Sequence, residues 1–69
     1  MAGLKRIGLN VKEYRTRANM TQAELANMVG VSKEYISFVE NAKKSASNEL
    51  LMRIAKATGV TLSDLVKGA

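Results

Sequence analysis

Residues 21–40 read TQAELANMVGVSKEYISFVE, and the spacing of polar and apolar residues in this stretch decides the fold. Thr21 followed by Glu24 is the T-x-x-E pattern of a capping box, which opens a helix that we expect to run to about Val29. Gly30 tolerates the left-handed backbone that commonly ends a helix. The first half of the stretch therefore predicts one short helix with its own start and stop signals.

A second short helix follows directly. Ser32 is a suitable N-cap, and Ile36 with Val39 supplies the buried side of a helix that fades near Asn41. Ala26 is small where this helix must approach the first one closely. The apolar side chains expected to fix the crossing of the two helices are Leu25, Val29, Val31, Ile36 and Val39. Two helices joined by a three- or four-residue turn with a glycine have the geometry of the helix-turn-helix DNA-binding motif.

Helical spacing predicts three more helices outside residues 21–40. The first runs from about Arg6 to Ala18, and the other two follow the loop NAKKSAS at 41–47. Their expected cap and stop residues are Asn19, Ser47, Gly59, Thr61 and Asp64. The residues expected on the stripes or faces of the first two of these helices are Ile7, Val11, Tyr14, Ala18, Leu51, Ile54, Ala55 and Thr58, and the last helix carries Leu62, Leu65 and Val66. With no proline and few aromatic residues, the chain is predicted to be one all-α domain of five helices over residues 1–69.

Composition excludes several classes of function. The chain has no histidine and no cysteine, which removes the usual general base, the thiol nucleophile, disulfides and the common zinc sites. We therefore expect no enzymatic activity, no metal, no cofactor and no small-molecule ligand. The start MAGLKRIGLN lacks the continuous apolar run of a signal peptide, so a soluble cytoplasmic protein without membrane contact is expected.

The charge balance favours a polyanionic partner. Eleven Lys and Arg against six Asp and Glu give a net charge of +5 and a pI near 9.9. Five of the basic residues lie in the first 20 positions against the single acid Glu13, so that segment carries +4. Lys5 and Arg6 either reach DNA or belong to a solvated terminus. DNA is preferred over RNA or a membrane, because there are no paired stacking aromatics and no basic face with apolar anchors.

From Ile7 to about Leu65 the chain resembles the Cro and phage-repressor (Xre-type) helix-turn-helix family. The elements that carry the resemblance are YRTRANMTQAELANMVGVS, YISFVEN and LLMRIAKATGVTLSDL. The resemblance implies a compact five-helix, lambda-repressor-like domain whose third helix lies in the DNA major groove. It also implies a dimer on a palindromic operator.

The resemblance further implies site residues. The base-reading positions are Lys33, Glu34, Ser37 and Phe38. The phosphate-contacting positions are Gln22, Ser32, Asn41, Lys43 and Lys44. Arg15 and Glu40 match residues that form a partly buried ion pair in the family. Ala42 departs from the family because glycine is usual there, which allows the left-handed turn to shift to Asn41 and leaves the path of the loop at 41–47 open.

The residues alone predict an outward face on the third helix. Each proposed DNA contact on it has an alternative in which the side chain has no DNA-binding role. Positions i, i+1, i+4, i+5 and i+8 share one side of a helix, and here they are Lys33, Glu34, Ser37, Phe38 and Asn41. The alternative is a solvated face with one exposed phenylalanine. Glu34 either accepts from cytosine N4 or only complements the helix dipole. Lys43 and Lys44 are phosphate contacts or ordinary surface lysines.

Two classes of function remain. The first is a sequence-specific double-stranded DNA-binding regulator, most simply a dimeric repressor. Its expected dimer contact is formed by the exposed apolar residues of the last helix, Leu62 and Val66, with Met52. The second is an antitoxin or adaptor that uses the same fold mainly to bind another protein. A chain that ends about three residues after its last helix favours the first, because no separate toxin-wrapping tail follows.

Overall fold

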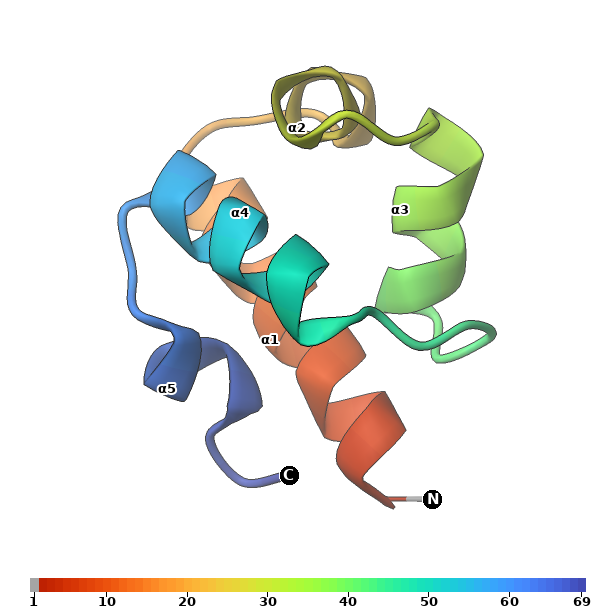
Figure 1. Cartoon of the computed structure of the whole chain (residues 1–69), viewed down its shortest axis with the longest axis vertical. Coiled ribbons are helices and arrows are strands. Elements are labelled where there is room, and N and C mark those ends of the chain that lie inside the picture. The colour runs from red at the N-terminus through yellow and green to blue at the C-terminus, as the bar shows by residue number, and fades with distance from the viewer. Residues whose placement is uncertain (1) are drawn as a thin grey trace.

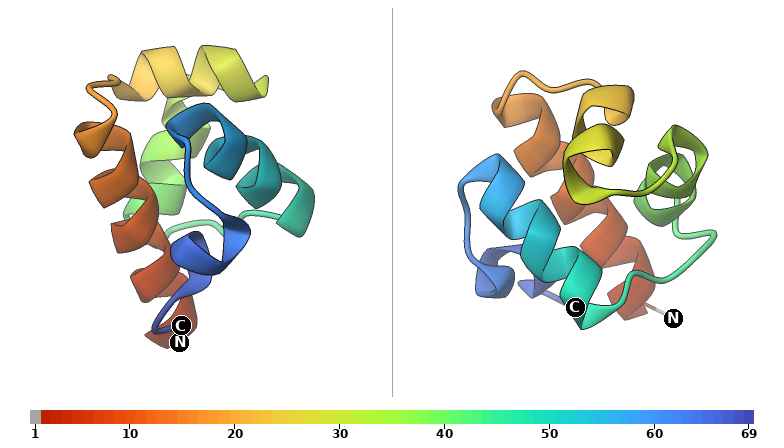
Figure 2. Two further views of the ribbon diagram at one scale, coloured as in Figure 1. Left: turned by 90° about the vertical axis from the view of Figure 1, so that its left-hand side faces the viewer. Right: turned by 45° about the horizontal axis from the view of Figure 1, so that its top comes forward.

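Five helices build the whole fold in the computed structural model, which describes residues 2–69. They are α1 (Ala2–Arg17), α2 (Gln22–Val29), α3 (Lys33–Glu40), α4 (Asn48–Thr58) and α5 (Leu62–Val66). The described residues form no strand, so the all-α prediction is confirmed. Helix α2 lies across one end of the molecule, and the two chain ends lie together at the other (Figures 1 and 2). No helix within 2–69 has both the length and the hydropathy of a membrane span.

Helix α1 is longer than predicted. It begins at Ala2 rather than Arg6, because Ala, Leu and Lys are good helix formers and the half-buried Leu4 extends the apolar stripe of the half-buried Ile7 and the buried Val11 toward the N-terminus. It ends at Arg17, so Ala18 lies outside the helix and is exposed instead of buried. The predicted left-handed stop at Asn19 is confirmed, with φ of 58°.

The predicted caps of the other helices are confirmed. The Thr21 side chain accepts from the Glu24 backbone N–H at 3.0 Å, and the Glu24 carboxylate accepts from the Thr21 N–H at 2.8 Å. The same reciprocal pair joins Thr61 and Asp64 before α5. The Thr61 backbone N–H that donates to Asp64 lowers the pKa of that carboxyl below its ordinary value. Local capping chemistry therefore fixes where these helices start.

The core lies where α1, α2, α3, α4 and α5 converge. Its buried apolar residues are Val11, Leu25, Ala26, Val29, Ile36, Val39, Leu50, Leu51, Ile54, Ala55 and Leu65. Of the five predicted wedge residues, only Val31 is partly rather than fully buried. Leu62 and Val66, expected to be exposed, are instead partly buried against the core, because α5 covers the core with Leu65.

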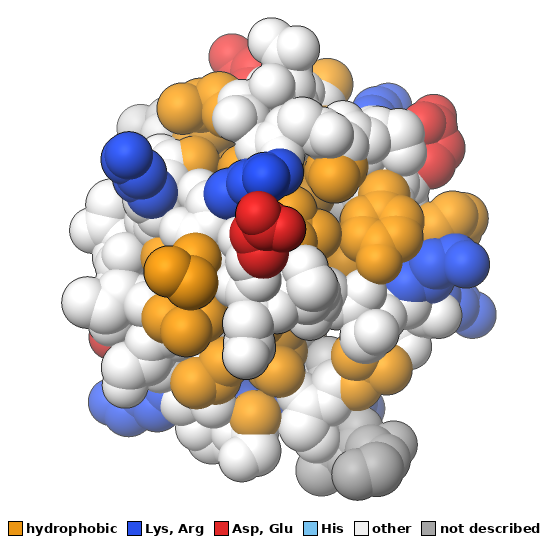
Figure 3. Space-filling model, viewed as in Figure 1, with side chains coloured by type: hydrophobic (Ala, Val, Ile, Leu, Met, Phe, Trp, Pro, Cys, Tyr) orange, Lys and Arg blue, Asp and Glu red, His pale blue; other side chains and the backbone are white. Residues whose placement is uncertain are grey.

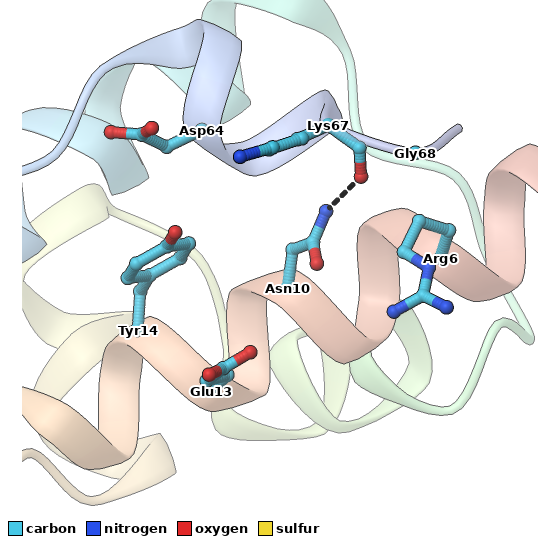
Figure 4. Close-up of a pocket in the computed structure, with 7 residues that line it drawn as sticks. All are labelled: Arg6, Asn10, Glu13, Tyr14, Asp64, Lys67 and Gly68. Carbon is cyan, nitrogen blue, oxygen red and sulfur yellow. Dashed lines mark hydrogen bonds between the residues drawn. The ribbon is translucent and has the colours of Figure 1, made fainter.

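A buried asparagine joins the first helix to the last. The Asn10 side-chain amide donates to the Leu65 and Lys67 carbonyls, both at 2.9 Å (Figure 4 shows the second bond). Both carbonyls come from the end of α5, which thereby docks on α1. An open depression of about 350 Å³ lies beside this contact, with Tyr14 and Asp64 in its lining (Figure 4). The periodicity of α1 alone did not reveal Asn10, since its partners lie more than 50 residues away.

Helices α1 and α3 cross in backbone contact at Gly8. A Cβ atom at this buried position would lie 2.5 Å from the Val39 carbonyl oxygen and 2.8 Å from that of Glu40. Only glycine allows the last turn of α3 to lie this close to α1. The position of α3 therefore depends on this one residue of α1.

The turn after α3 corrects the sequence-based expectation. Ala42 itself has the left-handed backbone, with φ of 59°, while Asn41 stays at −97°. The reason is the hydrogen bonding around the helix end: the Ala42 N–H donates to the Val39 carbonyl at 3.2 Å, and the Lys43 N–H to the Phe38 carbonyl at 2.7 Å. These bonds close a C-terminal turn that requires its left-handed residue at position 42.

Ala42→Gly is expected to stabilise the fold by about 0.5–1 kcal/mol, because glycine adopts the left-handed conformation without the Cβ penalty and part of that gain is lost to unfolded-state entropy. Urea unfolding followed by circular dichroism measures the change. Ala23→Gly, at an exposed helical position in α2, is the matched control and should destabilise the protein. Equal losses of unfolding free energy from Ala42→Gly and Ala23→Gly would contradict the conclusion that the turn after α3 requires a left-handed residue at position 42.

Candidate nucleic-acid interface

The exposed side of α3 carries the residues predicted to read bases. Lys33 and Glu34 are exposed at its first turn, Ser37 is half-buried, and Phe38 is 42% exposed. The opposite side buries Ile36, Val39 and Glu40 in the protein. Helix α3 forms one flank of the molecule (Figure 1). Hydrophobic surface lies beside Lys and Arg side chains on that flank (Figure 3).

Hydrogen bonds hold the loop after α3 against the helix. The Phe38 carbonyl accepts from the backbone N–H groups of Lys43 and Lys44, at 2.7 and 3.3 Å. The Tyr35 hydroxyl donates to the Ser45 carbonyl at 2.6 Å. The side chains of both lysines are exposed, so two cations are held next to the end of α3. Sequence reasoning missed the role of Tyr35, because a bond that spans ten residues from a helix to a loop has no local signature.

Two predicted phosphate-contacting side chains already have partners within the protein. The Asn41 amide nitrogen donates to the Ser37 carbonyl at 2.9 Å, which holds the side chain against α3. The Ser32 hydroxyl oxygen accepts from the Tyr35 N–H at 3.0 Å and caps α3. The Asn41 amide nitrogen also lies 3.5 Å from the Ser37 hydroxyl oxygen, whereas the hydroxyl hydrogen of Ser32 remains available as a donor.

Arg15 and Glu40 lie together beneath this surface. The Arg15 Nε donates to Glu40 Oε2 at 2.6 Å and its Nη2 to Oε1 at 3.1 Å, which is a bidentate pair. Arg15 Nη1 also donates to the Met20 carbonyl at 2.7 Å. The two side chains are only 10% and 1% exposed. The pair ties the end of α1 to the end of α3.

Gln22 joins this pair. Its Nε2 donates to Glu40 Oε1 at 3.0 Å, from the first residue of α2. The side chain is half-buried, so the residue predicted to contact phosphate is packed against the ion pair rather than extended into solvent. Nothing in the spacing of Gln22 and Glu40 indicates this contact, because the two residues lie on different helices.

The basic residues of α1 are not all placed beside α3. Arg17 pairs with Glu13 at 2.7 Å, and its guanidinium lies 5.4 Å from the centre of the Tyr14 ring. Arg6 lies near Gly68 at the C-terminal end, on the α5 side of α1. Arg17 and Arg6 thus have contacts outside α3, whereas Lys33 lies on α3 and Lys43 and Lys44 lie on the loop that follows it. No acidic cluster suited to a metal ion occurs in the part of the chain that the structure describes.

Comparison with known proteins identifies relatives of the whole architecture. Residues 11–65 match a family model described as helix-turn-helix. An uncharacterized HTH-type transcriptional regulator of Archaeoglobus fulgidus is 42% identical over 55 residues, which are 80% of this chain and 78% of that protein. Antitoxin PezA of Streptococcus pneumoniae is 38% identical over 60 residues, which are 87% of this chain and 38% of that protein.

A solved structure shows the same arrangement on DNA. The crystal structure of the P22 c2 repressor in complex with a synthetic operator superposes with a TM-score of 0.82 at 32% sequence identity. The superposition covers 91% of this chain and 96% of that one. The likeness therefore extends over most of the chain.

Proposed function

Since the chain belongs to the helix-turn-helix family of transcriptional regulators, we propose that it is a repressor that binds a palindromic operator in double-stranded DNA as a homodimer. The observation that carries the proposal is the exposed side of α3 with two exposed lysines fastened beside it by the Phe38 carbonyl. Phosphate contacts give affinity and base contacts give sequence preference, and this surface offers both kinds of group side by side. We further propose that it acts in the cytoplasm.

The proposed contacts divide into two groups. We assign base reading to Lys33, Glu34, Ser37 and Phe38. We assign phosphate contact to Gln22, Ser32, Asn41, Lys43 and Lys44. Lysine donates to guanine O6 and N7, a carboxylate accepts from cytosine N4, and an apolar ring contacts the thymine methyl group. The exposed part of α3 can therefore distinguish several bases within one half-site.

A dimer is expected because one recognition helix reads too few base pairs. Two copies about 34 Å apart on a two-fold axis place both helices in successive major grooves. Met52 is 59% exposed on α4, and Leu62 and Val66 are partly buried on α5. We propose these three residues as the dimer contact.

Selection of bound duplexes from a random pool tests the function. A two-fold symmetric sequence is the expected product. If each monomer neutralises about three to five phosphates, the slope of log affinity against log salt should be roughly −5 to −9 for the dimer. Replacing Lys43 and Lys44 with methionine should flatten this slope without changing the selected sequence. A flat response in the unmodified protein, or no advantage of the selected site over scrambled duplex, would contradict the proposal.

Phe38→Ala should weaken operator binding and relax the preference for thymine at one position per half-site, because the ring is the apolar group available to the thymine methyl. Thermal stability should change by no more than about 0.5 kcal/mol, as for a surface residue. Leu9→Ala is the matched control, since Leu9 is 44% exposed on α1. A large fall in melting temperature with unchanged base preference would instead make Phe38 a structural residue that packs against Tyr35 or the loop.

A second candidate function is that of an antitoxin, and the likeness to PezA supports it. The same fold would then serve mainly to bind a toxin protein. Antitoxins of this fold often also bind DNA, so an enriched duplex sequence is compatible with this candidate as well. What distinguishes the two functions is the need for a surface beyond residues 21–40: substitutions outside this stretch that abolish function in cells while operator affinity stays unchanged would favour the antitoxin.

A further inference from the structure

The Glu40 carboxylate lies where three helices meet. It accepts from Arg15 at the end of α1 through both oxygens, and from Gln22 at the start of α2 through Oε1. The Glu40 side chain is 1% exposed, while Gln22 is half-buried at the edge of the same site. Glu40, a buried residue of α3, thus holds the Gln22 side chain, which reaches the surface.

The chemistry of this contact fixes the orientation of the Gln22 amide. An ionised carboxylate only accepts hydrogen bonds, so the amide must present nitrogen rather than oxygen to Glu40. One N–H of Nε2 is used at 3.0 Å, and the second N–H remains free. A DNA phosphate is also an acceptor only, and it therefore needs that second N–H.

Two features make the arrangement suitable for an anion. The bidentate guanidinium of Arg15 compensates the negative charge of Glu40, which would otherwise repel a phosphate. The amide lies on the first residue of α2, where backbone N–H groups and the helix dipole favour an anion. A side chain already ordered in the free protein also loses less entropy on binding.

We propose that Glu40 is a positioning residue for DNA binding: it orients the Gln22 amide so that its free N–H donates to a phosphate of the operator. The ion pair of Glu40 with Arg15 then contributes to DNA affinity as well as to the fold. This proposal rests on the proposed function.

The test measures the effect of Gln22→Leu on operator affinity in two backgrounds. One is the native chain and the other carries Arg15→Met with Glu40→Leu, because replacing both partners of a buried pair with apolar residues commonly preserves the fold. In the native background Gln22→Leu should weaken binding about tenfold per half-site, as loss of a hydrogen bond to a charged group does. In the apolar background the loss should be less than about twofold, because Gln22 is no longer oriented.

Lys43→Met, measured in both backgrounds, is the control, since its contact does not pass through Glu40. It should weaken binding equally in the two. Equal losses from Gln22→Leu in both backgrounds, or no loss in the native one, would overturn the proposal. A Lys43→Met effect that also disappears in the apolar background would overturn it too, because the pair would then act on the whole docked geometry. If the native chain selects no operator, the proposed function fails before this question arises.

A second measurement needs no DNA. The side-chain amide resonances of Gln22 in the free protein should report restricted motion in the native chain. They should become motionally averaged in the Arg15→Met, Glu40→Leu background, in which the amide of Asn41 serves as an internal reference. Equal mobility of Gln22 in both proteins would contradict orientation by Glu40.

Discussion

Arg15→Met is expected to lower the free energy of unfolding by about 3 kcal/mol, because it leaves the Glu40 carboxylate buried without its charge partner. Arg15→Met combined with Glu40→Leu should cost far less than the sum of the single changes. Urea unfolding of the four proteins in this double-mutant cycle should give a coupling above about 1 kcal/mol. A small domain has only a few kcal/mol to lose, so the cycle is best measured in a stabilising osmolyte.

The exposed pair Arg17 with Glu13 is the matched control for this cycle. Its atoms approach as closely, at 2.7 Å, but the side chains are 65% and 52% exposed. Water screens such a pair, and its coupling should be no more than about 0.5 kcal/mol. Additive losses of unfolding free energy from the single substitutions at Arg15 and Glu40 would mean that the contact between these buried side chains contributes no coupling energy.

Gly8→Ala is the second substitution with a large expected effect. A Cβ atom at 2.5 Å from the Val39 carbonyl oxygen forces α1 and α3 apart, and both neighbouring groups are backbone that cannot rotate away. A loss of about 3 kcal/mol is expected, at the upper end of the cost of overpacking. Because α3 must move, operator binding should also weaken in the molecules that stay folded.

Gly3→Ala is the control for the second prediction. Its Cβ would meet Ala69 at 3.7 Å, an ordinary van der Waals distance, and the position is helical. Alanine there should leave thermal stability unchanged or slightly higher. A Gly8→Ala protein with the melting temperature of the Gly3→Ala protein would show that the crossing of α1 and α3 adapts at little cost.

Sequence reasoning predicted the helices well because their signals are local. Thr21 with Glu24, and Gly30 after Val29, are cap patterns within a few residues of each helix end. The start of α1 was missed because no cap residue marks it. Ala42 was misjudged because its backbone is set by the hydrogen bonds of the turn after α3 and not by its own preference.

In the candidate site, too, local sequence patterns predict some features and miss those that depend on distant partners. The outward face of α3 follows from helical periodicity alone, whereas the roles of Gly8, Asn10 and Tyr35 depend on partners in other elements. The contact between Gln22 and Glu40 is of the second kind. Such contacts decide how rigidly the surface is held, and no spacing within one helix encodes them.

The bond from Asn10 to the end of α5 has a consequence for synthesis of the chain on the ribosome. Its partner Lys67 follows Asn10 by 57 residues. At translation rates of about 5–20 residues per second, roughly 3–11 s pass between the synthesis of Asn10 and the synthesis of Lys67. Helix α1 is thus made first, yet its buried amide is satisfied only after α2, α3, α4 and α5 have been made. A nascent chain halted before Lys67 would contain the whole of α3, while α1, against which α3 packs, still lacked its hydrogen bond to the Lys67 carbonyl.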